Sequence, residues 1–145
     1  MSLVKSTIRL LKSYNSILTS IENIQDEIKN MEYTGMKTSK IDGMPYSPSG
    51  ASITEIEALI MIAKKTELKK LLNKNTTILR IIDRAIDSLL DKERDVIVGF
   101  YIEKRTWDEI GEIVAHSPRH CLRIRDEALV KMSEAIYGHF ELMEK

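Results

Sequence analysis

Residues 106–132 read TWDEIGEIVAHSPRHCLRIRDEALVKM, and this stretch contains two helix starts separated by a short turn. Thr106 is followed three residues later by Glu109, which is the capping-box pattern of a helix N-terminus. Ser117 is followed directly by Pro118, the pattern of an N-cap serine with proline at the first helical position. The stretch therefore predicts a short helix, a turn of about three residues and a second helix.

Apolar residues give each of these two helices one inward face, because they recur at helical spacing after each start. They are Trp107, Ile110, Ile113 and Val114 in the first helix and Cys121, Ile124, Ala128, Leu129 and Met132 in the second. A further short helix is expected from Asp91 to Tyr101, with Val96, Ile97 and either Phe100 or Tyr101 turned inward, followed by a break over residues 102–105. The last third of the chain thus predicts three short helices packed closely together.

Two long helices are expected before residue 91. In the first, apolar residues alternate steps of four and three, which is the seam of a heptad helix: Leu10, Tyr14, Ile17, Ile21, Ile24, Ile28 and Met31. Glycines, prolines and serines then interrupt the periodicity until Ser52, which with Glu55 predicts a capped helix start at Ile53. The seam of this second helix comprises Met61, Lys65, Leu68, Leu72, Asn75, Leu79, Ile82, Ile86 and Leu89.

The sequence leaves the pairing of the two long helices open. Their seams can join as an antiparallel hairpin within the chain or as a coiled coil with another chain, so a homodimer through the long helices is one alternative. Asn75 on the second seam can fix the register of a coiled coil, or it can mark a helix break together with Asn73. The expected organisation is an N-terminal helix over 1–33, a loop or linker over 34–52, a long second helix over 53–90 and a C-terminal domain over 91–145.

Composition places the chain in the all-α class. The hydrophobic fraction is 43% but the aromatic fraction is only 6%, and glycine and proline are scarce outside one stretch, which favours helix over strand. The single cysteine, Cys121, excludes an intramolecular disulfide, and no N-terminal segment has the continuous apolar run of a signal peptide or membrane span. We expect a cytoplasmic protein that has no membrane partner.

Charge along the chain is more informative than its sum. The formal net charge of +0 argues against nucleic-acid binding through overall charge, so any such contact requires a local basic patch. Residues 117–125 contain three arginines and no acid, and Arg119 and Arg123, four residues apart, share one helix face. A helix, a short turn and a second helix with basic residues in its first two turns is the arrangement that places side chains in the major groove of double-stranded DNA.

The sequence therefore predicts a DNA-binding helix-turn-helix. Lys104 and Arg105, just before the first helix of the pair, are placed to meet the phosphate backbone. The expected DNA-binding residues are Lys104, Arg105, Thr106, Ser117, Arg119, His120, Arg123 and Arg125. The alternative for an arginine cluster of this size is an ordinary solvated face.

Three blocks of the C-terminal region resemble region four, the promoter-reading region of sigma-70-type RNA polymerase sigma factors. They are LDKERDVI at 90–97, TWDEIG at 106–111 and the helix at 117–132, and their order and spacing agree with that family. Within the sigma class the chain most resembles the short phage and prophage late-transcription regulators of the ArpU and RinA type. The loop IDGMPYSPSG at 41–50 is similar to a Gly-Met-Pro loop in several of those regulators.

The resemblance implies a phage or prophage transcription regulator that acts at promoters, with RNA polymerase as a further partner. Position by position, it implies base contacts from Arg119 and Arg123, with His120 and Arg125 closer to the backbone. Pro118 and Leu122 stand where primary sigma factors usually carry arginine, so the promoter preference need not follow theirs. The helices expected before residue 90 lack the cluster of exposed aromatics with which a complete sigma factor stacks on unpaired bases.

Other functions find less support in the residues. No Gly-rich phosphate loop or converging carboxylates indicate an enzyme or a cofactor, so we expect neither. His116, His120 and Cys121 could suggest a metal site, but the turn between the histidines makes surface or packing roles the better interpretation. The rival functions are a DNA-recognition subunit of a phage packaging ring, which the oligomer size would reveal, and a polymerase-binding or other protein adaptor without salt-sensitive DNA affinity.

Overall fold

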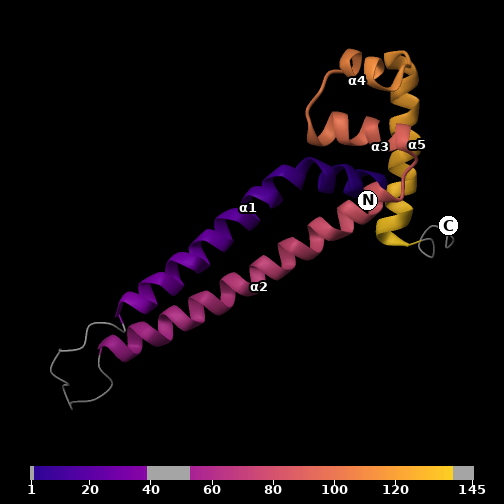
Figure 1. The fold of residues 1–145 in the computed structure, drawn as a ribbon. Coiled ribbons are helices and arrows are strands. Elements are labelled where there is room, and N and C mark those ends of the chain that lie inside the picture. The colour runs from indigo at the N-terminus through magenta and orange to yellow at the C-terminus, as the bar shows by residue number, and fades with distance from the viewer. Residues whose placement is uncertain (1, 39–52, 139–145) are drawn as a thin grey trace. The chain divides into compact units, whose positions relative to one another are not determined.

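The computed structural model describes residues 2–38 and 53–138, and within these ranges every regular element is a helix and none is a strand, which confirms the all-α prediction (Figure 1). The elements are α1 (Leu3–Thr38), α2 (Ile53–Asp87), α3 (Asp91–Ile97), a π-helical turn η1 (Val98–Ile102), α4 (Trp107–Val114) and α5 (Pro118–Tyr137). The loop at 41–50, for which a resemblance was noted, and the predicted cap at Ser52 lie outside the described residues.

The ends of several helices differ from the predicted ones. α1 continues to Thr38 rather than ending at 33, since Gly35 costs a helix only about 1 kcal/mol relative to alanine and good helix formers follow it. α2 starts at Ile53 as predicted but ends at Asp87, three residues before the expected end. The helix that starts at Asp91 continues as η1 through Ile102, so the break before α4 covers residues 103–106 rather than the predicted 102–105.

The chain divides into two compact units, one formed by residues 18–77 and the other by residues up to 17 together with those from 78 onward. The unit that holds the C-terminal helices therefore also contains the start of α1 and the end of α2, which the sequence had grouped with the long helices alone. α1 and α2 each contribute to both units.

In the unit of residues 18–77, α1 and α2 pair antiparallel within the chain. Ile21, Ile24 and Ile28 are buried along this pairing. At one end the Lys65 ammonium lies 2.9 Å from the Glu32 carboxylate, and at the other the Asn75 amide donates to Ser20 Oγ at 3.1 Å. α2 runs unbroken through Asn75, so the predicted alternative of a helix break there is wrong, and the amide bridges the two helices instead.

The other unit has two hydrophobic clusters. The first joins the start of α1 and the end of α2 to α3 and α5 through buried residues such as Leu11, Ile82, Ile97 and Met132. Beside it the Tyr14 hydroxyl donates to Asp83 Oδ1 at 2.8 Å. The second cluster holds α3, α4 and α5 together and consists of Val96, Ile110, Val114, Cys121 and Ile124, with Phe100 and Trp107 packed against it.

All five predicted inward residues of α5 are buried, which fixes the helix face that remains for binding. Figure 1 shows α3 and α4 beside α5, with α5 extending past both. In the ranges that the structure covers, none of the helices combines the length and the apolar character needed to cross a bilayer.

Candidate nucleic-acid interface

The two predicted caps define the start of α4 and the start of α5. Thr106 Oγ1 accepts a hydrogen bond from the Glu109 backbone N–H at 3.2 Å. Ser117 Oγ accepts from the His120 backbone N–H at 3.2 Å, and Pro118 occupies the first turn of α5. Each cap satisfies one of the backbone donors that a helix start leaves free, so both helices begin at sharply defined residues.

The turn between α4 and α5 is held tightly against α4. Ala115 adopts the left-handed conformation, with φ 59° and ψ 43°, and its backbone N–H donates to the Gly111 carbonyl. A Cβ atom on Gly111 would lie 2.7 Å from the His116 carbonyl oxygen, closer than real Cβ contacts allow. The approach of turn to helix therefore requires glycine at 111, a requirement that the sequence analysis did not identify.

Three of the predicted residues form a basic surface at the start of α5. Arg119, His120 and Arg123 are exposed, and together with Ser117 they line one hollow. Within residues 2–38 and 53–138, neither Arg119 nor Arg123 has an ion-pair or hydrogen-bond partner. Their guanidinium groups are one helical turn apart and available to an external ligand.

The other two predicted arginines are already paired within the protein. Arg125 is half-buried; its guanidinium donates to Asp126 at 2.9 Å and lies 5.6 Å from the centre of the Trp107 ring. Arg105 forms ion pairs with Glu103 and Glu109, and the hydrogen bond to Glu103 raises its pKa. Neither arginine lines the hollow at the start of α5.

Lys104 and Thr106 also lie outside that hollow. Lys104 is exposed in the segment before α4 and has a φ of 60°. The Thr106 hydroxyl accepts a hydrogen bond from the Glu109 backbone N–H and donates one to the Glu109 carboxylate at 3.3 Å. The role that the structure gives Thr106 is therefore that of a helix cap, and Lys104 remains an exposed charge in front of α4.

Lys92 on α3 adds a positive charge to this region that the sequence analysis missed. Its ammonium lies 3.0 Å from His116 Nε2. Because an ammonium can only donate, this imidazole nitrogen accepts. The pKa of His116 is lowered, first by desolvation and then by the positive charges of Lys92 and His120, whose ring centre lies 4.4 Å away. No sequence signal links Lys92 to His116, since they are 24 residues apart and meet only through the packing of α3 on the turn.

A second hollow, on the α4 side of the turn, has the opposite charge. Asp108 and Glu112 line it together with the turn residues, and it shares Ser117 with the basic hollow. A polyanion would be repelled from this acidic side and attracted to the α5 side. The surface around Ser117 is thus acidic on its α4 side and basic on its α5 side.

The histidines and the cysteine do not come together as metal ligands. Cys121 is fully buried in the second hydrophobic cluster, where burial raises the pKa of its thiol. His116 and His120 lie outside that cluster, and the part of the chain that the structure describes has no group of three His, Cys, Asp or Glu side chains placed to hold a metal ion.

No family model matches this chain, and no curated protein or solved structure matches it significantly. What the chain binds therefore has to be inferred from the geometry and charge of α4, the turn and α5.

Proposed function

We propose that this protein is a sequence-specific DNA-binding transcription regulator of the phage or prophage type, in which α4, the turn and α5 act as a helix-turn-helix. In this proposal α5 is the recognition helix and its first two turns enter the major groove. The observation that carries the proposal is the pair Arg119 and Arg123, exposed, one turn apart and without a partner among the described residues.

Arginine is the side chain best suited to read a base edge in this position. Its planar guanidinium can donate two hydrogen bonds to guanine O6 and N7, which discriminates that base from the others. Arg105 and Arg125 would have to break internal ion pairs before they could do the same. We therefore assign base contacts to Arg119 and Arg123 and give Arg105 and Arg125 supporting structural roles.

The phosphate backbone would be held by the groups around the N-terminus of α5. Ser117 can donate from its hydroxyl while still accepting from the His120 N–H, and the free backbone donors of a helix start attract anions. Lys92, on the neighbouring α3, and Lys104, before α4, add positive charge. These contacts would position α5 without reading sequence.

The acidic hollow gives the proposed regulator a second surface that DNA would not occupy. Asp108 and Glu112 are exposed on α4 and line a hollow that meets the basic hollow at Ser117, so phosphates would be attracted on the α5 side of Ser117 and repelled on its α4 side. A surface of this charge is available to a protein partner, and the resemblance to sigma region four favours RNA polymerase for that role.

The test is a DNA-binding titration in which sequence preference and salt dependence are both measured. Duplexes would be selected from a random-sequence library with the full chain and titrated at two salt concentrations, with the Arg119→Ala/Arg123→Ala variant beside the wild type. The matched control is Lys5→Ala/Lys12→Ala, which removes two positive charges that are exposed on α1.

We expect an enriched sequence whose binding weakens with salt and is lost in the arginine variant but kept in the lysine control. Absence of any enriched sequence with a folded protein would overturn the proposal and favour a protein adaptor. Equal loss in both variants would show that the affinity depends on overall charge rather than on a recognition helix.

A further inference from the structure

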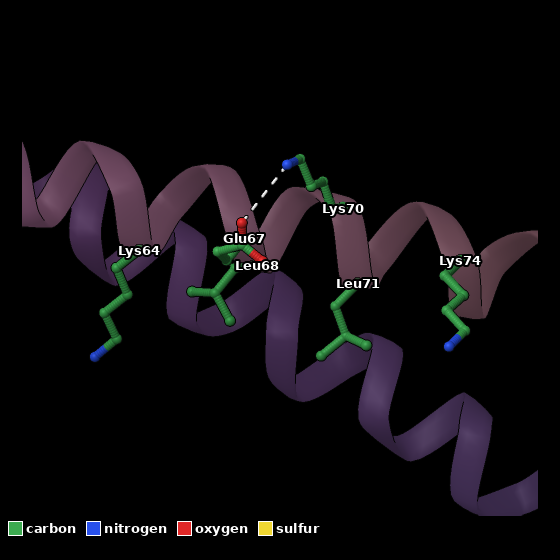
Figure 2. A pocket seen from close by; sticks show the side chains of 6 residues that line it. All are labelled: Lys64, Glu67, Leu68, Lys70, Leu71 and Lys74. Atoms are coloured by element: carbon green, nitrogen blue, oxygen red, sulfur yellow. Dashed lines mark ion pairs between the residues drawn. The ribbon is translucent and has the colours of Figure 1, made fainter.

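α2 carries a second heptad row in addition to the one that faces α1. The row consists of Glu57, Ile60, Lys64, Glu67, Leu71 and Lys74, spaced by three, four, three, four and three residues. All six are exposed; Ile60 retains 61% of its accessible surface and Leu71 44%. In Figure 2 Lys64, Leu71 and Lys74 project from the same side of α2, and the Glu67 carboxylate is turned toward Lys70. A regular row with exposed apolar members is a helix face suited to pairing with another helix.

This row is complementary to itself when it is reversed. Read forward its chemistry is acid, apolar, base, acid, apolar, base, and read backward it is base, apolar, acid, base, apolar, acid. Two copies placed antiparallel would therefore put Glu57 opposite Lys74, Ile60 opposite Leu71, and Lys64 opposite Glu67, each contact occurring twice about a two-fold axis. Every charged layer joins opposite charges and every apolar layer joins two apolar side chains.

We propose that the chain self-associates through this row, with α2 of one copy antiparallel to α2 of a second copy. A parallel arrangement is disfavoured because it would place Lys64 against Lys64 and Glu67 against Glu67. The inference goes beyond DNA binding and does not depend on it.

Neighbouring antiparallel registers are excluded by the same charges. A shift of one heptad in one direction would place Glu57 opposite Glu67 and Ile60 opposite Lys64. A shift in the other direction would place Lys64 opposite Lys74 and Glu67 opposite Leu71. The row thus specifies one register, because like-charge contacts in the alternatives are unfavourable.

The contacts that these charges make within one chain are weak enough to be replaced. Lys64 lies 3.5 Å from Glu27, and Glu67 lies 3.6 Å from Lys70, all on side chains that are about half exposed or more. Exposed pairs of this kind contribute little to folding. Pairing across the two-fold axis would exchange them for contacts flanked by the Ile60 and Leu71 layers, where screening by water is reduced.

The first experiment is a charge swap followed by sedimentation equilibrium of the full chain without DNA. We expect the wild type to form a species of twice the 16.6 kDa chain mass. Lys64→Glu would place acids opposite each other twice and weaken association by about tenfold or more, as would Glu67→Lys. The double variant Lys64→Glu/Glu67→Lys restores opposite charges and should recover the dimer. Lys69→Glu, an equal charge change off the row, should leave it unchanged.

The second experiment tests the register by oxidative cross-linking. Ile60→Cys and Leu71→Cys are expected to form a disulfide between chains when mixed, but neither should do so alone, because residues 60 and 71 of one helix are about 16 Å apart along its axis. Cys121 is fully buried and serves as an internal background in all samples.

A wild type that remains monomeric at about millimolar concentration, with a folded circular-dichroism spectrum, would overturn the proposal. Failure of the double charge variant to recover the dimer would overturn the antiparallel row even if the wild type associates. Neither result would overturn the proposal that α5 contacts DNA, which is tested separately with Arg119→Ala/Arg123→Ala.

Discussion

Replacing Arg123 by alanine should separate DNA binding from folding. Arg123 is exposed and has no ion-pair or hydrogen-bond partner among the described residues, so its loss should change the free energy of unfolding by less than about 0.5 kcal/mol. If its guanidinium contacts a base edge, the loss should cost about 1–3 kcal/mol of specific binding, or about 5- to 150-fold in Kd. The penalty should be largest for duplexes that keep the preferred base at the contacted position.

Arg125→Ala is the matched control, because it removes the same side chain two residues away on α5. That side chain donates to Asp126 and lies over Trp107, so its loss should lower the free energy of unfolding by about 1 kcal/mol. Specific DNA binding should change less than in Arg123→Ala. Arg123→Ala should therefore lower mainly the affinity for DNA, and Arg125→Ala mainly the free energy of unfolding.

Fluorescence anisotropy with a labelled selected duplex gives Kd, and urea denaturation gives the free energy of unfolding of the same samples. The reasoning would be refuted if Arg125→Ala weakened binding as much as Arg123→Ala, or if Arg123→Ala destabilised the fold. The first result would mean that DNA displaces Asp126 from Arg125, and the second that Arg123 has a packing role the structure does not show.

Three further predictions concern the scaffold that presents α5. Gly111→Ala should lower the free energy of unfolding by about 1–3 kcal/mol in urea titrations, since its Cβ would meet the His116 carbonyl oxygen at 2.7 Å; unchanged stability would show that the turn can move away. Ala115→Gly should instead raise the free energy of unfolding by up to about 1 kcal/mol, because glycine adopts a φ of 59° without strain; a lower free energy of unfolding would contradict this. Tyr14→Phe should cost about 1 kcal/mol at neutral pH by removing the hydrogen bond to Asp83. Burial, and then this hydrogen bond, raises the pKa of Tyr14 from 10.0 to about 12, so the Tyr14 hydroxyl stabilises the fold fully below pH 10.0 and this stabilisation is lost as pH rises through about 12. The free energy of unfolding of Tyr14→Phe should therefore decline less at alkaline pH than that of the wild type. Identical pH profiles for the two proteins would contradict the role given to Tyr14.

The sequence predicted those features of the C-terminal region that depend on neighbouring residues. The caps at Thr106 and Ser117 are local hydrogen-bonding patterns, and the inward face of α5 follows from a helical period, so both could be recognised without coordinates. The antiparallel pairing of α1 and α2 within the chain could not be predicted, because the apolar heptad seams of the two long helices fit a hairpin and an intermolecular coiled coil equally well. The contact of Asn75 with Ser20 depends on that choice.

The features that escaped prediction arise from packing between distant segments. Arg123 and Arg125 lie two residues apart in sequence, and the ion pair with Asp126 together with the position of Trp107 distinguishes the engaged guanidinium of Arg125 from that of Arg123. Lys92 contacts His116 because α3 packs on the turn, and Gly111 is required because the turn folds back onto α4. The sequence could therefore assign the candidate site to the helix that begins after Ser117, but it could not show which of its arginines are already paired within the protein.

The two proposals explain together how a chain with no net charge could hold DNA. Among the residues that the structure describes near α5, Arg119, Arg123 and a few lysines are available to an anion, so these residues of one copy would release few counterions on binding and would give a modest affinity. Association through the row on α2 would place two recognition helices in one particle, and binding of the first would raise the effective concentration of the second at the DNA. Affinity would then depend on the dimer rather than on the charge of the chain. A Lys64→Glu variant, whose α5 is intact, should consequently bind the selected duplex more weakly at protein concentrations below those at which it dimerises, and should regain affinity when Glu67→Lys restores the row.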